Sequence, residues 1–212
     1  QIRAARPLPC LPGDRFVVRL ASPATTIGGG VVIDPYAAVS RRSRAGESVE
    51  ILRGLEGGDP TAWLDRAGAA GLPEADTLLR AGRPVGEKLG DRYFSVEWLA
   101  AHRATLHAAL DAGHAAQPLA QGLNRKALRT GVLRALGDRE FLALIDAEVA
   151  AGRVVADTRG VRRPDWSVRL DPLQEVWRAA ALQAIEAGGY EGLEDVRKHA
   201  DHPQIEALLH LL

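Results

Sequence analysis

The sequence predicts a mixed α and β chain that is mainly helical, with strands at its start followed by repeated groups of helices and short strands. Three observations lead to this prediction. Two β-branched or aromatic runs lie within residues 1–36, and apolar residues at helical spacing begin after residue 46. One pattern at the end of a helix returns about 70 residues later, which indicates an internal repeat.

Residues 1–40 are predicted to be the closing strands of a β-domain. The runs Phe16–Leu20 and Val31–Ile33 are bounded by Pro, Gly and Asp, as strands commonly are. Two or three strands do not form a stable domain alone, so this piece belongs to a larger domain or docks on the helical part of the chain. Gly28-Gly29-Gly30 lacks the Gly-Lys-Ser/Thr ending of a phosphate loop and precedes a strand. We therefore expect a strand bend or bulge in which Gly adopts unusual backbone angles.

Residues 46–97 are predicted to form three helices and then a β-hairpin, which is the element order of a winged helix. The expected helices contain Val49–Leu55, Trp63–Ala67 and Glu74–Ala81, and the expected strands are Gly82–Val85 and Arg92–Val96 around a turn.

Residues 98–167 are predicted to repeat this arrangement. The expected elements are a helix over Leu99–Gly113, a second over Asn124–Leu136 with Asn124 as N-cap, a third from the N-cap Asp138 to a stop at Gly152, and strands at 153–155 and 161. The segment Ala81–Val85 resembles Ala151–Val155, where a helix stop precedes a strand in both modules.

Residues 168–212 are predicted to be a third, truncated winged helix. A helix containing Val176–Ile185 ends at Gly188-Gly189, and further helices follow over Leu193–His199 and Pro203–Leu212. The hairpin that would complete this module is not reached. The chain also contains no Met, so we expect that Gln1 is not the first residue of the gene product.

Composition argues against several classes of function. The net charge is zero, so no global basic field indicates a nucleic-acid partner. No apolar run approaches the ~20 residues needed to cross a bilayer, so we expect no membrane partner. The six His residues have no metal-ligand spacing, and we expect them to be solvated or capping. No Gly-x-Ser-x-Gly sequence accompanies the lone Cys10, so we expect no catalytic residue, metal or cofactor in this chain.

The charge is nevertheless uneven along the chain. Residues 1–46 carry +5, 47–97 carry −4, 98–166 carry +3 and 167–212 carry −4. The candidate RNA-binding residues are Arg125, Lys126, Arg129, Arg134, Arg197 and Lys198. The first four can equally form a solvated helix face, and acidic neighbours surround the last two. For the four Trp residues, core or inter-module packing is the expectation and base stacking the alternative.

Two stretches near the start resemble a known family. Pro12-Gly13-Asp14-Arg15-Phe16-Val17-Val18-Arg19 and Thr26-Ile27-Gly28-Gly29-Gly30-Val31-Val32-Ile33-Asp34-Pro35 look like the last β-barrel domain of the selenocysteine-specific elongation factor SelB. The segment Gln117–Arg129 is similar to the opening of that family's second winged helix. The resemblance implies the end of an elongation-factor β-barrel domain followed by tandem winged-helix modules.

The resemblance also implies a function. SelB delivers selenocysteyl-tRNA to the ribosome, and its last winged helices recognise an mRNA hairpin beside a UGA codon. We therefore expect a cytoplasmic, monomeric link between the tRNA-binding and hairpin-binding ends, with mRNA hairpin, selenocysteyl-tRNA and ribosome as partners. GTP and magnesium belong to the parent family's GTPase domain, which these 212 residues do not contain, so we expect no GTP hydrolysis by this chain.

A winged-helix DNA-binding transcription regulator is the alternative. The third helix of such a regulator is usually basic because it enters the major groove. Here Glu74–Ala81 contains one Arg against two carboxylates, and Asp138–Ala151 contains one Arg against four. This balance favours the translation factor.

Overall fold

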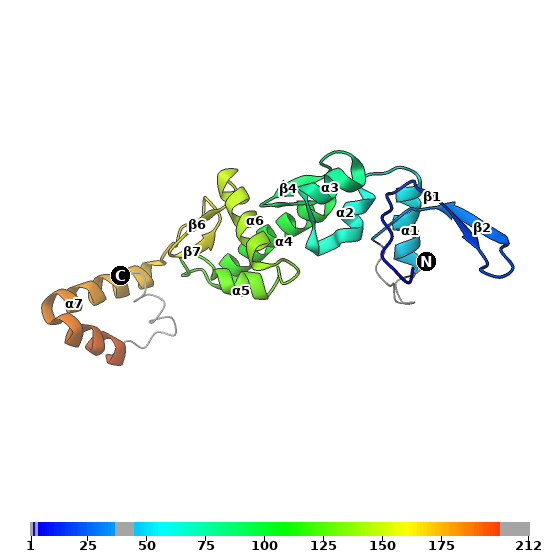
Figure 1. Cartoon of the computed structure of the whole chain (residues 1–212). Helices are drawn as coiled ribbons and strands as arrows, with labels where there is room; N and C mark the ends of the chain where they lie inside the picture. Colours follow the sequence, from blue (N-terminus) through cyan, green and yellow to red (C-terminus); the bar gives the residue numbers. More distant parts are fainter. Residues whose placement is uncertain (1, 3, 37–44, 200–212) are drawn as a thin grey trace. The chain divides into compact units, whose positions relative to one another are not determined.

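The computed structural model describes residue 2, residues 4–36 and residues 45–199. The chain divides into two compact units, Gln1–Ala101 and His102–Leu212. Each unit is described by itself below, with the element labels of Figure 1. The mixed α and β fold is confirmed, with small sheets among mainly helical segments. The finer division into 1–40, 46–97, 98–167 and 168–212 stays a prediction.

The first unit begins with an antiparallel hairpin of β1 (Arg15–Arg19) and β2 (Thr26–Val31). Val18 pairs with Gly28 and Arg19 with Thr26, so Ile27 is an extra residue that makes a bulge beside the glycines. A bulge was expected here, but the reason for the glycines differs from the predicted one. None of the three has a positive φ. A Cβ on Gly29 would instead lie 2.5 Å from the carbonyl oxygen of Phe16, so close backbone approach requires Gly.

The hairpin leaves its apolar side chains exposed. Val17 is 67% exposed and Ile27 is 59% exposed, so neither face of the two strands has a core within the described residues. A lone hairpin is at best marginally stable in water. That these strands belong to a β-barrel therefore stays a prediction. The expected strand Val31–Ile33 is wrong beyond its first residue, because β2 ends at Val31.

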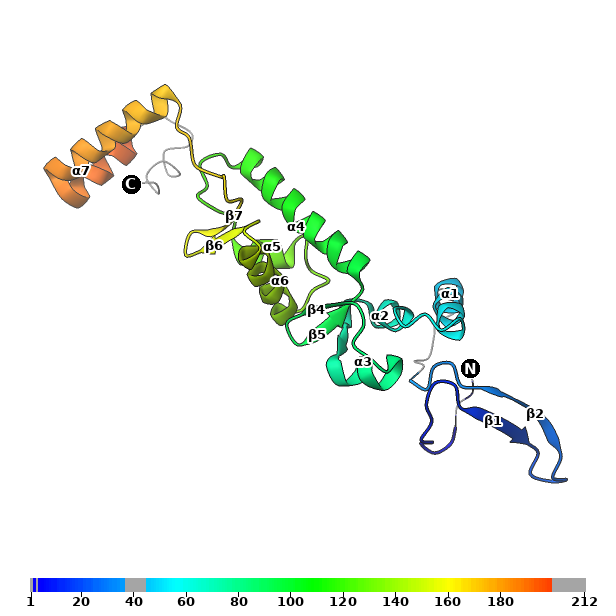
Figure 2. The same ribbon diagram turned by 90° about the horizontal axis from the view of Figure 1, so that it is seen from above.

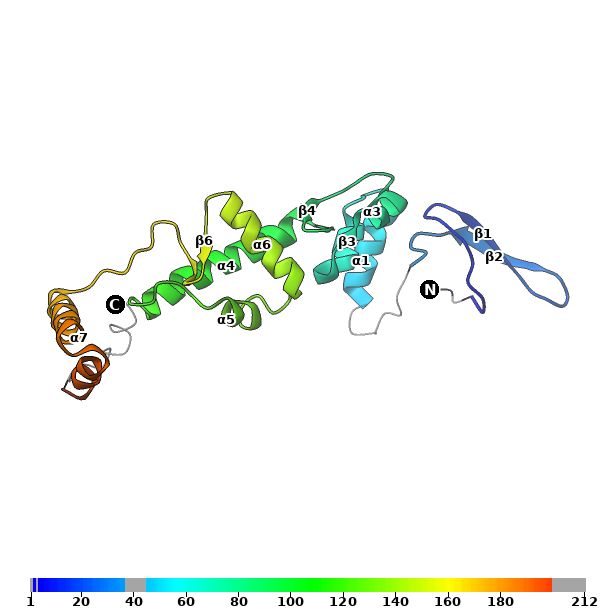
Figure 3. The same cartoon turned by 60° about the vertical axis from the view of Figure 1, so that its left-hand side comes forward.

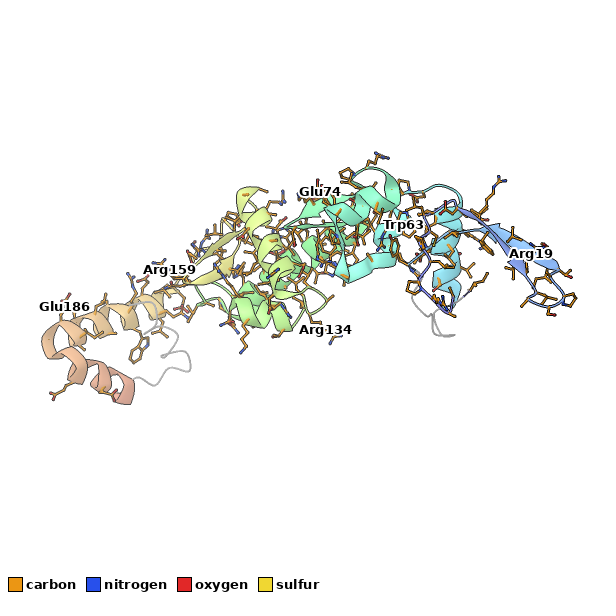
Figure 4. The ribbon with its side chains drawn as sticks, in the orientation of Figure 1. Arg19, Trp63, Glu74, Arg134, Arg159 and Glu186 are labelled. Atoms are coloured by element: carbon orange, nitrogen blue, oxygen red, sulfur yellow. The ribbon has the colours of Figure 1, made fainter. Side chains whose placement is uncertain are left out.

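The rest of the first unit is a helical group with a small sheet. Its elements are α1 (Ala45–Glu56), α2 (Ala62–Ala67), the 3₁₀ turn η2 (Gly68–Ala70), β3 (Leu72–Pro73), α3 (Glu74–Ala81), β4 (Glu87–Leu89) and β5 (Arg92–Phe94). The strands are ordered β3-β5-β4. Trp63, Leu64, Leu72 and Val85 form the core, and Figure 4 shows Trp63 on α2. The prediction that Trp63 packs in a core is confirmed.

One predicted strand in this unit is wrong. Gly82–Val85 is irregular, and the strand begins at Glu87. Gly82 ends α3 with a φ of 71°, and Gly86 has a φ of 77°, so the chain turns twice between the helix and β4. Val85 lies between the two turns and is buried, so its side chain reaches the core from an irregular segment.

Two contacts connect the segment after the hairpin to the helices of the same unit. The buried carboxylate of Asp34 lies 3.2 Å from Nε of Arg66, which is on α2. The guanidinium of Arg80, on α3, lies 4.4 Å from the ring centroid of Tyr36 and 5.5 Å from that of Trp63. An ion pair and a cation–π contact therefore join Asp34 and Tyr36 to α2 and α3.

The second unit takes up most of α4 (Val96–Ala116) and continues with α5 (Arg125–Thr130), α6 (Asp138–Ala150), β6 (Val155–Asp157) and β7 (Gly160–Arg162). Three predictions are wrong in detail. The strand expected at 153–155 overlaps β6 only at Val155, where β6 begins. The helix that starts after Asn124 ends at Thr130 rather than Leu136, and a run of turns follows it. Gly137 is the N-cap of α6, so Asp138 is its first residue.

The repeat of the helix end is confirmed. Gly82 follows α3 with a φ of 71° and Gly152 follows the last turn of α6 with a φ of 69°, so both helices end at a left-handed Gly. In both modules a further segment pairs with the hairpin, but its position in the chain differs. It lies after the second helix as β3 in the first module, whereas a single bridge of Leu123 to Val161 precedes α5 in the second.

The last described element is α7 (Pro172–His199), which consists of two helical arms. Gly189 has φ 56° and ψ −129° and separates them. This position matches the predicted stop at Gly188-Gly189. Figure 3 shows the two arms of α7. The helix predicted over Pro203–Leu212 lies outside the described residues. Among those that are described, no helix is both long and apolar enough to cross a membrane.

Candidate nucleic-acid interface

Two of the predicted RNA-binding residues lie in the first turn of α5. Asn124 Oδ1 accepts hydrogen bonds from the backbone N–H groups of Lys126 at 2.8 Å and Ala127 at 3.2 Å. The N-cap predicted from the sequence is therefore confirmed. The cap fixes where the helix begins, and it places Arg125 and Lys126 with exposed side chains at that end.

The other two residues of this predicted cluster have different surroundings. Arg129 Nε lies 2.7 Å from Asp138 Oδ1, so an acidic partner already balances its charge. Arg134 is exposed in the turns that follow α5, and Figure 4 labels it. Arg125 and Arg129 are four residues apart on α5, and they contribute one exposed cation and one cation that is paired with Asp138.

Arg197 and Lys198 lie on the second arm of α7. Their side chains fall outside the described residues. Their assignment to RNA binding stays a prediction, as it does for Arg125, Lys126, Arg129 and Arg134.

A buried carboxylate organises the interior of the second unit. The side chain of Glu148, on α6, is fully buried. It accepts hydrogen bonds from Arg153 Nη2 and Nε at 2.6 and 2.8 Å, from Arg103 Nε at 3.2 Å and from His107 at 2.7 Å. The bonds from Arg153 and His107 outweigh the cost of burial and lower the pKa of Glu148 to about 2. Figure 2 shows α6 beside α4, the helix that contributes Arg103 and His107.

His107 continues this network to the segment after β7. Its Nδ1 lies 2.6 Å from Arg163 Nη1, and its Nε2 lies 2.7 Å from Glu148 Oε2. A guanidinium only donates hydrogen bonds, so Nδ1 is the acceptor and Nε2 carries the proton. Arg163 also donates to both carboxylate oxygens of Asp111 at 2.7 and 2.8 Å, and this bidentate pair holds the pKa of Asp111 below its usual range.

A second histidine of α4 is buried nearby in the chain. His114 Nε2 accepts a hydrogen bond from the backbone N–H of Arg163 at 3.3 Å, and its ring stacks on Trp166 with centroids 4.0 Å apart. Burial lowers the pKa of the His114 imidazole. Trp166 in turn donates from Nε1 to the carbonyl of Ala120 at 2.9 Å. Trp166 thus packs inside the unit, as expected.

The prediction that all histidines are solvated or capping is therefore wrong for His107 and His114. A sequence signal existed. Arg103, His107, Asp111 and His114 are spaced by four, four and three residues, which places them on one face of a helix. The Ala, Leu and Gly residues between them form an apolar pattern, which predicts a helix but gives no sign that these polar side chains interact.

Within the described residues, no group of three or more His, Cys, Asp or Glu side chains could hold a metal ion. The titratable side chains that do lie together, around Glu148 and Asp111, form ion pairs and hydrogen bonds with one another that hold the fold together. The exposed cationic side chains of the second unit, such as Arg125, Lys126 and Arg134, are of a kind that binds anions such as phosphates.

Comparison with known proteins agrees with this fold. Residues 107–162 match the family model described as the winged helix of elongation factor SelB, specifically its second winged-helix domain. The matched range begins inside α4 and ends with β7.

A curated relative extends the match along the chain. The chain is 29% identical over 192 residues to a selenocysteine-specific elongation factor of Desulfomicrobium baculatum, and the match covers 80% of this chain. It covers 30% of the relative, so the chain spans about a third of that protein's length. On these two matches, the chain is similar to the C-terminal portion of the selenocysteine-specific elongation factor SelB, and residues 107–162 are a winged helix of that factor's kind.

Proposed function

We propose that the chain links the tRNA- and GTP-binding part of a selenocysteine-specific elongation factor to its mRNA-hairpin-binding modules. In this role it supports incorporation of selenocysteine at UGA codons in the cytoplasm. Its partners are the selenocysteine-insertion hairpin of the mRNA, selenocysteyl-tRNA and the ribosome. The observation that carries the proposal is a match to one such factor along 80% of the chain.

The arrangement of the second module supports a linking role over a catalytic one. Its buried polar side chains are engaged with one another around Glu148 and Asp111. These contacts stabilise the fold, because each of them joins segments that are distant in the chain or closes the end of a helix. GTP and magnesium are the cofactors of the parent family's GTPase domain, and the chain itself hydrolyses no GTP in this proposal.

DNA-binding regulation is a weaker explanation. In the second module α6 begins with Asp138 and Glu140 in its first turn, and no basic residue lies in its last turn. In the first module α3 has Glu74 and Asp76 in its first turn. Both third helices would bring carboxylates toward the phosphates that flank a major groove, which is unfavourable.

A chimera tests the linking role. The part of the Desulfomicrobium baculatum factor that aligns with this chain is replaced by the chain, and the rest of that factor is kept. Readthrough of a UGA codon upstream of a selenocysteine-insertion hairpin is then measured in a host that lacks its own factor. We expect readthrough to be restored, whereas deletion of the aligned part abolishes it. A soluble chimera that hydrolyses GTP normally but gives no readthrough would refute the proposal.

A further inference from the structure

Half of the cationic side chains in the second module form ion pairs within the module, and the other half do not. Of ten basic side chains in residues 98–166, a stretch that is described without a gap, five are arginines in ion pairs with Glu148, Asp138, Asp157 or Asp111. The remaining five, for which the structure gives no ion pair in this stretch, are Arg125, Lys126, Arg134, Arg139 and Arg159. These positions supply five of the ten positive charges in a stretch whose net charge is +3.

Three of these cations come from two segments that the backbone brings together. Leu123 and Val161 exchange backbone hydrogen bonds of 2.8 and 2.9 Å in an antiparallel bridge. Arg125 follows Leu123 by two residues and Arg159 precedes Val161 by two, so both lie at the same end of this bridge. Figure 4 shows Arg159 near the β6–β7 hairpin.

The backbones of the two segments lie so close together that neither Gly122 nor Gly160 has room for a side chain. A Cβ on Gly122 would lie 3.0 Å from the carbonyl oxygen of Arg159, and a Cβ on Gly160 would lie 2.6 Å from that of Leu123. The cap of Asn124 on Lys126 and Ala127 then starts α5 directly beside the hairpin turn. The exposed side chains of Arg125, Lys126 and Arg159 consequently share one surface.

The carboxylate of Asp157 adjoins this surface and already has hydrogen-bond partners. Asp157 accepts hydrogen bonds from Arg162 Nη1 and from the backbone N–H of Arg159, each at 2.8 Å. These bonds hold the pKa of Asp157 below its usual range, so it remains ionised and offsets part of the charge of Arg162 and Arg159. Arg125 and Lys126 have no such neighbour among the ion pairs of residues 98–166.

We propose that Arg125, Lys126 and Arg159 together bind the phosphate backbone of RNA, while α6, the third helix of the module, does not enter a groove. The proposal rests on the proposed function for the choice of RNA over DNA. The RNA is recognised by its charge alone. Arg125 and Lys126 at the start of α5 and Arg159 in the hairpin turn contact phosphates and do not contact the base edges that carry sequence information. Binding is therefore weak, independent of sequence and sensitive to salt.

The test uses the whole 212-residue chain and a fluorescein-labelled 20-base-pair RNA duplex, with anisotropy measured from about 25 to 200 mM salt. In the test variant, Arg125, Lys126 and Arg159 are each changed to Gln. The control variant has Gln at Arg83, Arg139 and Arg169, three exposed arginines outside the surface, so both variants lose the same charge. Circular dichroism verifies that both retain their helices.

We expect the test variant to bind RNA at least about tenfold more weakly at the lowest salt, with a salt dependence about 2 to 3 units shallower in log–log slope. The control variant should stay within about twofold of the unchanged chain. Equal losses in both variants, or no binding by the unchanged chain, would overturn the proposal. Similar binding to duplex DNA of the same length supports a phosphate surface and shows that the RNA preference arises elsewhere.

The outcome is separable from that of the linking role. If the chimera supports readthrough but the chain does not bind RNA, the surface is refuted and the linking role stands. If RNA binding is lost only in the test variant while the chimera is inactive, the surface stands and the linking role is refuted.

Discussion

The imidazole Nε2 of His107 donates a hydrogen bond of 2.7 Å to Oε2 of Glu148, a carboxylate with no exposed surface. The two residues are 41 positions apart, one on α4 and one on α6. Because the opposite imidazole nitrogen accepts from Arg163, this single side chain joins two helices and the segment after the hairpin.

Replacement of Glu148 by Ala should destabilise the second unit strongly. The change leaves Arg103, Arg153 and His107 without their common acceptor, and loss of one partner of a buried ion pair typically costs about 3–5 kcal/mol. Hydrogen exchange at the amides of α6 measures the free energy of local opening directly. Asp146→Ala, at an exposed position of the same helix, should change it by less than about 0.5 kcal/mol. Similar protection in both variants would show that the network contributes little.

Acid should weaken the same unit in a pH range set by Glu148. Its pKa is about 2 in the folded chain against an ordinary value of 4.5. A carboxylate whose pKa is lower in the folded chain than in the unfolded chain stabilises the fold. This stabilisation is complete above the pKa of the unfolded chain and is lost as the pH falls to the pKa of the folded chain. The loss should amount to about 3 kcal/mol between pH 5 and pH 2.

Urea unfolding followed at the Trp166 indole resonance measures this dependence. Its N–H bonds to Ala120, so the signal reports on the second unit. The Glu148→Gln variant cannot ionise at this position, and its stability should fall less steeply over the same range. Parallel curves for the variant and the unchanged chain would mean that other carboxylates, such as Asp111, cause the acid sensitivity.

Removal of the N-cap should loosen the start of α5. Asn124→Ala leaves the N–H groups of Lys126 and Ala127 without their acceptor, at a cost of about 1 kcal/mol. Exchange rates of these two amides, measured by NMR, should rise about fivefold. Asn124→Asp retains an acceptor and should keep them protected. Unchanged rates in the Ala variant would indicate that the Leu123–Val161 bridge alone fixes the helix start.

A Cβ at Gly160 should disturb the hairpin more than one at Gly152. Gly160 has a φ of 120°, and its Cβ would lie 2.6 Å from the Leu123 carbonyl oxygen, so the bridge must open. Gly152 has a φ of 69° with open space around it, so Ala there costs only the backbone strain of about 1 kcal/mol. Thermal unfolding should show a clearly larger drop for Gly160→Ala. Equal drops would contradict the close approach.

Local sequence patterns located most helices correctly because the information lies within a few residues. The predicted range Glu74–Ala81 coincides with α3, and Asn124 caps α5 as expected. The failures occur where local pattern and tertiary contact compete. Gly82–Val85 follows a helix stop and ends in a β-branched Val, as a strand could, yet the left-handed Gly82 and Gly86 turn the chain so that Val85 fills the core. Leu133 and Leu136 fit a longer helix but are buried from turns instead.

The sequence by itself determined the order of elements, the repeated helix end at Gly82 and Gly152, and the family to which the chain is similar. These features depend on short-range spacing and on which residues tolerate a left-handed turn. Only the tertiary structure decided which charges are used internally. Glu148 and Asp111 neutralise arginines that are distant in the chain, and the Leu123–Val161 bridge brings Arg125 to Arg159. Because charges interact through space, the surplus of cations becomes a surface only after the chain has folded.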